Sequence, residues 1–215
     1  GENGAGKTTL MKILFGLERP DSGEIYLHGE KVTIGSPLTA IRLGIGMVHQ
    51  HFMLVPNLTV AENMFLGIEP HKKGFFSDRG EMEKAAAEVC EKYNFPLNPR
   101  DKVKNLSVAS MQKLEILKAL VRGAKILILD EPTAVLTPQE TSELFRQLVD
   151  FKDNGFTIIF ISHKLREIKE ICDRITVMKN GKNMGVYSVA DVSEQEISRL
   201  MVGRDVILHF TKEDS

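Results

Sequence analysis

Strand-length apolar runs alternate with amphipathic stretches of helical spacing along this chain. Residues 45–50, 125–130 and 157–162 each form a short, mostly apolar run, of the kind that is covered on both faces in a parallel sheet. Residues 10–15 carry apolar side chains at helical spacing, and Gly16 after them can end a helix in a left-handed conformation. This order of elements predicts an α/β fold with a layered sheet.

A further helix is predicted from residue 137 onward, both by a start signal and by the spacing of its apolar residues. Residues 137–140 have the form of a capping box, with proline at the first helical position. The apolar residues that follow predict the face that this helix turns toward the core: Leu144, Phe145, Leu148 and Val149.

Two hairpins and a helical insertion complete the predicted organisation. Residues 23–32 alternate about a His-Gly turn, and residues 175–178 lead into an Asn-Gly turn at 180–181, so both segments predict antiparallel hairpins. From about residue 52 to 120 the pattern is helical and more charged, with its clearest helix at residues 81–90. We therefore expect a helical subdomain inserted between strands.

The first eight residues match the phosphate-binding pattern G-x-x-x-x-G-K-[ST], and Thr9 follows it. Glycines allow backbone N–H groups to close around a polyphosphate, Lys7 can reach its outer phosphates, and the Thr8 hydroxyl can bind Mg²⁺. The helix that follows adds a dipole that favours anions. A plain tight turn is the alternative. The predicted nucleoside triphosphate site comprises Gly1, Asn3, Gly4, Ala5, Gly6, Lys7, Thr8 and Thr9.

Acidic and polar residues follow the ends of the predicted strands. Ligands of open parallel sheets bind beyond the carboxyl ends of the strands, so Asp130 is expected to hold Mg²⁺ and Glu131 to orient the attacking water. His163 is a candidate sensor of the γ-phosphate, and Gln50 can complete the Mg²⁺ and water shell. The alternatives are a solvated acidic turn, a structural histidine and an ordinary surface glutamine.

Composition narrows the function classes. The 215 residues include 28 lysines and arginines against 29 acidic residues, which gives no overall basic field for nucleic acid. Cys90 and Cys172 lack metal-ligand spacing, so reduced thiols in a reducing compartment are expected. Apolar runs are far shorter than the roughly 20 residues that span a bilayer. Any role at a membrane would therefore depend on a partner.

These motifs occur in the order found in ABC transporter ATPase domains, which the chain resembles over nearly its whole length. The phosphate loop is followed by a Q-loop at Gln50, a signature segment at residues 106–110, a Walker B strand at 126–131, a D-loop at 134–137 and His163. The resemblance implies a RecA-like P-loop NTPase core with an antiparallel β subdomain and an inserted helical subdomain. It also implies two such domains that sandwich two ATP molecules, with Ser107 and Ala109 capping the γ-phosphate bound to the opposite domain.

Residues 47–63 and 130–140 resemble the importers of nucleosides and simple sugars, in which two ATPase domains are usually fused. This implies a nucleotide-binding domain at residues 1–205, a linker or tail at 206–215, and an amino-terminal half without its first strand and its adenine-stacking aromatic residue. The implied partners are a second ATPase domain in the same polypeptide, transmembrane permeases and, indirectly, a substrate-binding lipoprotein, at the cytoplasmic face of the membrane. Residues 52–55 are the candidate permease contact, with ordinary subdomain core as the alternative.

One departure and two rival functions remain open at this point. Ala109 stands where the family usually has glycine, and its methyl group could hold the partner domain's phosphate away. A non-transport ABC ATPase of DNA repair or translation would share the motifs but should carry coiled-coil insertions or basic arms. A regulatory module that does not hydrolyse ATP should have lost Glu131 or His163, and both are present.

Overall fold

The computed structural model describes residues 4–68 and 79–202, which fall into two compact units. The core unit consists of residues 11–161, and the terminal unit joins residues 4–10 to residues 162–202. The first helix, α1 (Lys7–Leu14), begins in the terminal unit and ends in the core unit. Gly1, Asn3 and the expected tail at 206–215 lie outside the described residues.

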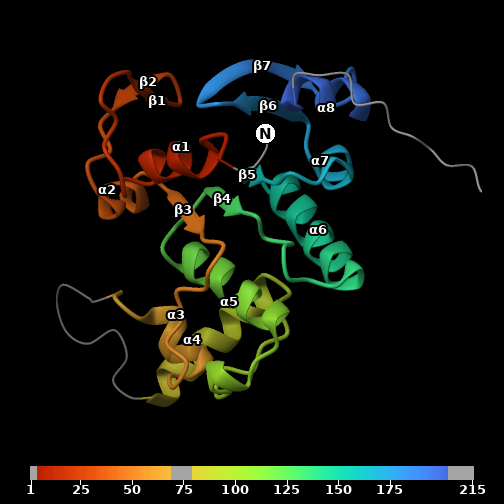
Figure 1. Ribbon diagram of the computed structural model, residues 1–215. Helices are drawn as coiled ribbons and strands as arrows, with labels where there is room; N and C mark the ends of the chain where they lie inside the picture. The colour runs from red at the N-terminus through yellow and green to blue at the C-terminus, as the bar shows by residue number, and fades with distance from the viewer. Residues whose placement is uncertain (1–3, 69–78, 203–215) are drawn as a thin grey trace, which may run out of the picture. The chain divides into compact units, whose positions relative to one another are not determined.

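A three-stranded parallel sheet in the order β3-β4-β5 forms the centre of the core unit (Figure 1). Its central strand carries three side chains with no exposed surface, at residues 127–129. The predicted strands are confirmed, although β3 stops two residues before Gln50 and β5 one residue before Ser162. The strands are β3 (Ile45–Val48), β4 (Ile126–Asp130) and β5 (Thr157–Ile161).

Helix α6 (Pro138–Asp153) packs against β5 and begins with the predicted capping box. The Thr137 side chain accepts a hydrogen bond from the Glu140 amide, and the Glu140 carboxylate accepts one from the Thr137 amide. The predicted inner face is right for Leu144, Phe145 and Leu148 but wrong for Val149, which is 38% exposed. Phe151 and Gln147 are buried on that face instead, because Val149 lies beyond the edge of the apolar stripe.

Helix α1 packs its apolar residues onto the core unit's first hydrophobic cluster. Met11, Leu14 and Phe15 contact a buried group that includes residues of β3, β4 and β5. Gly16 then ends the helix with φ 78°, and a Cβ atom there would lie 2.5 Å from the backbone of Ser36. Helix α2 (Pro37–Arg42) starts at that close approach, with Ser36 as its N-cap.

The remaining part of the core unit contains the first hairpin and the helical insertion, as predicted. His28 and Gly29 form the hairpin turn with φ values of 52° and 84°, which are typical of the favoured tight turns. Helix α5 packs against α3, α4 and β3 (Figure 1). The elements are β1 (Ile25–Leu27), β2 (Glu30–Val32), α3 (Val60–Phe65), α4 (Arg79–Lys92), a 3₁₀ helix η1 (Val103–Asn105) and α5 (Val108–Val121).

The terminal unit is built on the second predicted hairpin. Asn180 and Gly181 form its turn with φ values of 49° and 74°. One hydrophobic cluster joins the hairpin to the two neighbouring helices, with Val177 and Ile197 completely buried. The elements are α7 (Leu165–Ile171), β6 (Arg174–Lys179), β7 (Lys182–Ser188) and α8 (Glu194–Val202). None of the helices in the described ranges combines the length and apolar character that crossing a bilayer requires.

Candidate functional site

The described part of the phosphate loop is held by the second hairpin of the terminal unit. Gly4 and Gly6 have φ values of 77° and 93°, in the left-handed region that favours glycine. The Gly181 amide donates a hydrogen bond of 3.0 Å to the Ala5 carbonyl oxygen. A Cβ atom on Gly6 would lie 3.4 Å from the Gly181 Cα atom. The sequence did not indicate this contact between the loop and the β6–β7 turn.

Helix α1 begins at Lys7, so its first amides follow directly on the loop. The Leu10 amide closes the first turn on the Gly6 carbonyl oxygen at 3.0 Å. Thr8 and Thr9 are exposed, Lys7 is half-buried and Ala5 is buried. This local geometry fits a bound polyphosphate, because backbone N–H groups at a helix start attract anions and glycines allow their close approach.

The acidic pair lies at the carboxyl end of the central strand, as predicted. Asp130 is the last residue of β4 and only 4% exposed. Its Oδ1 atom is buried and has no hydrogen-bond partner among the described residues. An isolated buried carboxylate oxygen is costly, and a hard cation such as Mg²⁺ would satisfy it. The buried Asp130 carboxylate therefore fits the role of a Mg²⁺ ligand.

Glu131 adopts a left-handed backbone conformation with φ 49° directly after the strand. Its amide donates a hydrogen bond of 3.0 Å to the carbonyl oxygen of Ile161, the last residue of β5. Non-glycine residues seldom occupy this region, and they do so most often at functional sites and turns.

Gln50 follows the end of the neighbouring strand. It is exposed and lies two residues beyond β3, whose register pairs Val48 with Leu129 of β4. Gln50 thus follows the carboxyl end of β3, and Asp130 is the carboxyl-terminal residue of the adjacent parallel strand β4. His49, which the sequence did not single out, contacts Phe15 edge-to-face at 6.1 Å between ring centroids. Burial lowers the pKa of His49, against the opposing effect of the Glu115 and Asp130 carboxylates.

His163 is exposed, and the residues on both sides of it are tied to the start of helix α7. The buried Ser162 hydroxyl donates to Glu167 at 3.1 Å and accepts from the Lys164 amide at 3.0 Å. The Lys164 ammonium group also lies 3.0 Å from the Glu167 carboxylate. Glu167 is 9% exposed, which is unusual for an acidic residue, and the sequence did not single it out.

The signature segment forms the start of helix α5. Ser107 is the N-cap, and its side chain accepts a hydrogen bond of 3.2 Å from the Ser110 amide. The Ser107 hydroxyl also donates to the Ser110 hydroxyl at 3.0 Å. Ser107 is exposed, whereas Ala109 is half-buried in the first turn.

A protein-family model described as ABC transporter matches residues 1–134. This chain belongs to the ABC transporter family. Similar solved structures include the ADP conformation of MJ1267, an ATP-binding cassette of an ABC transporter. It has a TM-score of 0.76 and 27% identity, over 94% of this chain and 81% of the cassette. The fold is therefore that of the P-loop ATPase cassettes of this family, as the sequence predicts.

Curated relatives within the family carry names of import proteins. The guanosine import ATP-binding protein NupO of Bacillus subtilis is 52% identical over 96% of this chain and 40% of its own length. The nucleoside import ATP-binding protein NupA of Lactococcus lactis is 49% identical over the same shares. The ribose import ATP-binding protein RbsA 3 of Rubrobacter xylanophilus is 47% identical over 96% of this chain and 41% of its length. The chain thus spans less than half the length of these relatives.

Proposed function

We propose that this chain is an ATP-binding and ATP-hydrolysing domain of an importer for nucleosides or simple sugars. The observation that carries the proposal is the phosphate loop, with left-handed glycines at 4 and 6 and helix α1 starting at Lys7, in a chain that belongs to the ABC transporter family.

In this proposal each predicted site residue has one role. The loop amides and Lys7 bind the phosphates, and Thr8 and Asp130 hold Mg²⁺, with Gln50 in its outer shell. Bound Mg²⁺ would neutralise charge on the outer phosphates. Glu131 orients the attacking water and accepts its proton, while His163 donates a hydrogen bond to the γ-phosphate as charge develops.

We also infer a second ATPase domain, in the carboxyl-terminal part of the same polypeptide. Ser107 would then bind the γ-phosphate of the ATP in that second domain. Its hydroxyl and the first amides of helix α5 can bind an anion, and they are distant in sequence from the phosphate loop of this chain. Any weakening of that contact by the Ala109 methyl group would fall on the ATP site of the second domain, and this chain's own ATP site would keep its catalytic residues.

The permease and the transported solute belong to the proposal as well. The names of the relatives, which specify import of guanosine, nucleosides and ribose, support a transport role over a role in DNA repair or translation. Residues 52–55 are the proposed permease contact, and the domain would act at the cytoplasmic face of the membrane. Met53 and Val55 are 66% and 39% exposed, which favours this contact over the alternative of ordinary subdomain core.

The test is ATP-driven uptake by the full-length polypeptide assembled with its permeases and binding lipoprotein in proteoliposomes. Labelled guanosine and labelled ribose are compared, each with and without ATP. Glu131→Gln should abolish both uptake and ATP turnover, whereas Asp150→Asn, which changes an exposed carboxylate on helix α6, should preserve both. Full ATP turnover in Glu131→Gln would refute the role of Glu131. Absence of ATP turnover in the assembled wild type would refute the proposed function.

A further inference from the structure

Residues 51–55 alternate between exposed and half-buried although they lie outside the strands. His51, Met53 and Val55 are exposed, while Phe52 and Leu54 are half-buried. Such alternation is typical of an extended segment, in which every second side chain packs against the protein and the others face solvent. An extended segment outside a sheet lacks the strand neighbour that would otherwise satisfy its backbone N–H and C=O groups.

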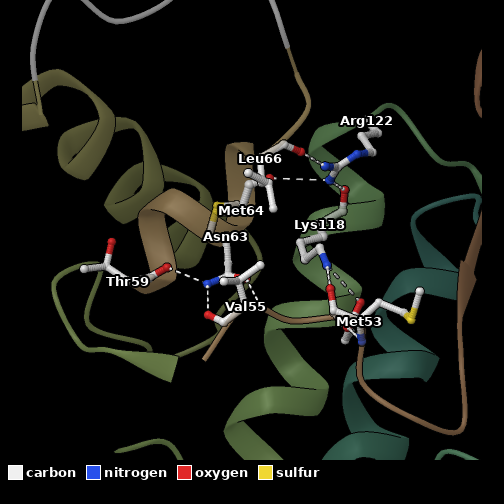
Figure 2. Close-up of polar contacts among 9 residues, drawn as sticks. Met53, Val55, Thr59, Asn63, Met64, Leu66, Lys118 and Arg122 are labelled. Atoms are coloured by element: carbon white, nitrogen blue, oxygen red, sulfur yellow. Dashed lines mark hydrogen bonds and ion pairs between the residues drawn. The ribbon is translucent and has the colours of Figure 1, made fainter. Parts of the chain in front are cut away.

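Two side chains of helix α5 take the place of a strand neighbour at Met53. The Glu115 carboxylate accepts a hydrogen bond from the Met53 amide, and the Lys118 ammonium group donates one of 2.6 Å to the Met53 carbonyl oxygen. Glu115 and Lys118 also pair with each other at 3.4 Å, and their side chains are only 6% and 13% exposed. Figure 2 shows Lys118 directed at the backbone of Met53, whose side chain extends away from the helix.

One buried side-chain amide likewise binds the backbone N–H and C=O groups of Val55. Asn63 of helix α3 is completely buried, and its Oδ1 atom accepts a hydrogen bond of 2.8 Å from the Val55 amide. Its Nδ2 group donates to the carbonyl oxygens of Val55 and Thr59, each at 3.0 Å (Figure 2). The backbone N–H and C=O groups of two alternate residues are therefore all bound, while the apolar side chains of both residues face solvent.

These contacts give a reason for charged side chains inside an apolar helix. Glu115 lies between Leu114 and Ile116, which have no exposed surface. Burial lowers the pKa of Lys118, and the adjacent Glu115 opposes that effect. Buried charges are rarely retained unless they are paired and hydrogen-bonded, and here their bonds are directed at a single peptide segment.

We propose that Glu115, Lys118 and Asn63 are positioning residues that present Met53 and Val55 as a preformed apolar contact for a permease subunit. This inference rests on the proposed function. A segment fixed before binding loses less conformational entropy when the partner docks, so the same apolar contact binds more tightly. Arg122 extends the attachment, because its guanidinium group donates to the Leu66 carbonyl oxygen and, at 3.4 Å, to that of Met64. Helix α5 and its C-cap residue Arg122 thus hold both the middle of the segment and the end of α3.

The test measures how strongly the permeases stimulate ATP turnover of the full-length polypeptide. Lys118→Met keeps the length of the side chain but removes the donor to Met53. Met53→Ser keeps the backbone contacts but removes the apolar side chain. Lys113→Met is the matched control, because Lys113 lies on the same helix and pairs instead with Glu143 of α6 at 2.8 Å.

Lys118→Met and Met53→Ser should each reduce permease stimulation about tenfold, the effect of losing roughly one charge-assisted hydrogen bond or one buried apolar side chain. Lys113→Met should keep the stimulation. In Lys118→Met the KM for ATP should remain that of the wild type, which separates positioning from damage to the nucleotide site. Undiminished stimulation in Lys118→Met, or an equal loss of permease-free turnover, would overturn the inference. Absence of stimulation in the wild type would instead count against the proposed function.

Hydrogen exchange of the wild-type polypeptide provides a readout that does not depend on how the variants fold. The Met53 and Val55 amides should exchange as slowly as the amides of helix α5, despite their exposed side chains. Exchange of both amides at the rate of an unprotected peptide would overturn the inference.

Discussion

The Glu131 amide is hydrogen-bonded to the carbonyl oxygen of Ile161 at 3.0 Å. This bond continues the pairing of β4 and β5 by one residue beyond Asp130, which is itself paired with Ile161 in the register. Glu131 then turns the chain with a φ of 49°, and its carbonyl oxygen accepts a hydrogen bond of 3.2 Å from the Ala134 amide. Hydrogen bonding at the carboxyl end of the sheet thus holds Glu131, the proposed water-orienting residue, in a left-handed backbone conformation that is unfavourable for a non-glycine residue.

Replacing Glu131 should reverse the usual stability order of alanine and glycine. Left-handed backbone costs about 1 kcal/mol or more for a residue with a Cβ atom and little for glycine. We expect the free energy of unfolding of Glu131→Gly to exceed that of Glu131→Ala by about 1 kcal/mol, with ATP turnover abolished in both. Urea denaturation of the two variants measures the difference. A more stable alanine variant would show that φ at this position is not constrained.

His49 should make stability depend on pH between neutral and mildly acidic conditions. Burial lowers its pKa, and Lys118 and Lys12 add to this, whereas Glu115 and Asp130 act in the opposite direction. As pH falls, the unfolded state therefore takes up the proton before the folded state does. The free energy of unfolding decreases as pH falls below the ordinary histidine pKa of about 6.5. The loss stops once pH is below the lowered pKa of the folded state.

The measurement is the free energy of unfolding at pH 7.5 and at pH 5.5, in the wild type and in His49→Gln. The wild type should lose more stability than the variant between these two conditions. His28→Gln is the control, because His28 is exposed in a hairpin turn. An equal loss in the wild type and in His49→Gln would contradict the assignment.

Gly46 in β3 is a position where helix α5 and its connection leave no room for a side chain. A Cβ atom there would lie 2.8 Å from the Ala119 Cβ atom and 2.9 Å from the Ala124 Cβ atom. We expect Gly46→Ala to lower the free energy of unfolding by about 1–3 kcal/mol through overpacking. Gly35→Ala, where a Cβ atom would meet nothing within 4 Å, should be neutral or slightly stabilising. Thermal denaturation of both variants tests this, and equal midpoints would contradict it.

Local signals account for the parts of the structure that the sequence predicted well. The His28-Gly29 and Asn180-Gly181 turns require positive φ at two successive residues, so their residue types alone indicate the hairpins. The capping box at Thr137 and the continuous apolar run of β4 are equally local. Periodicity failed at Val149, because apolar residues continue past the edge of the buried stripe of α6 and only the packed structure shows where burial ends.

The polar attachment of Met53 could not be predicted, because it joins positions 62 and 65 residues apart in the chain. The only local signal is a polar pair, Glu115 and Lys118, within an otherwise apolar stretch of α5. Such a pair on a buried face indicates a specific partner without indicating which one. For the nucleotide site, the sequence supplied every candidate residue that we propose, whereas the bracing of the phosphate loop by Gly181 required the structure.

The most direct test of the account is calorimetric titration of the full-length polypeptide with ATP, in the presence and in the absence of Mg²⁺. The buried Asp130 Oδ1 atom has no hydrogen-bond partner in the described part of the chain, which predicts that Asp130→Asn binds one fewer ATP tightly in Mg²⁺ than the wild type. No such deficit is expected in Asp150→Asn. A wild type that takes up no Mg-ATP, or an Asp130→Asn variant that binds as many ATP molecules with the same affinity, would contradict the account.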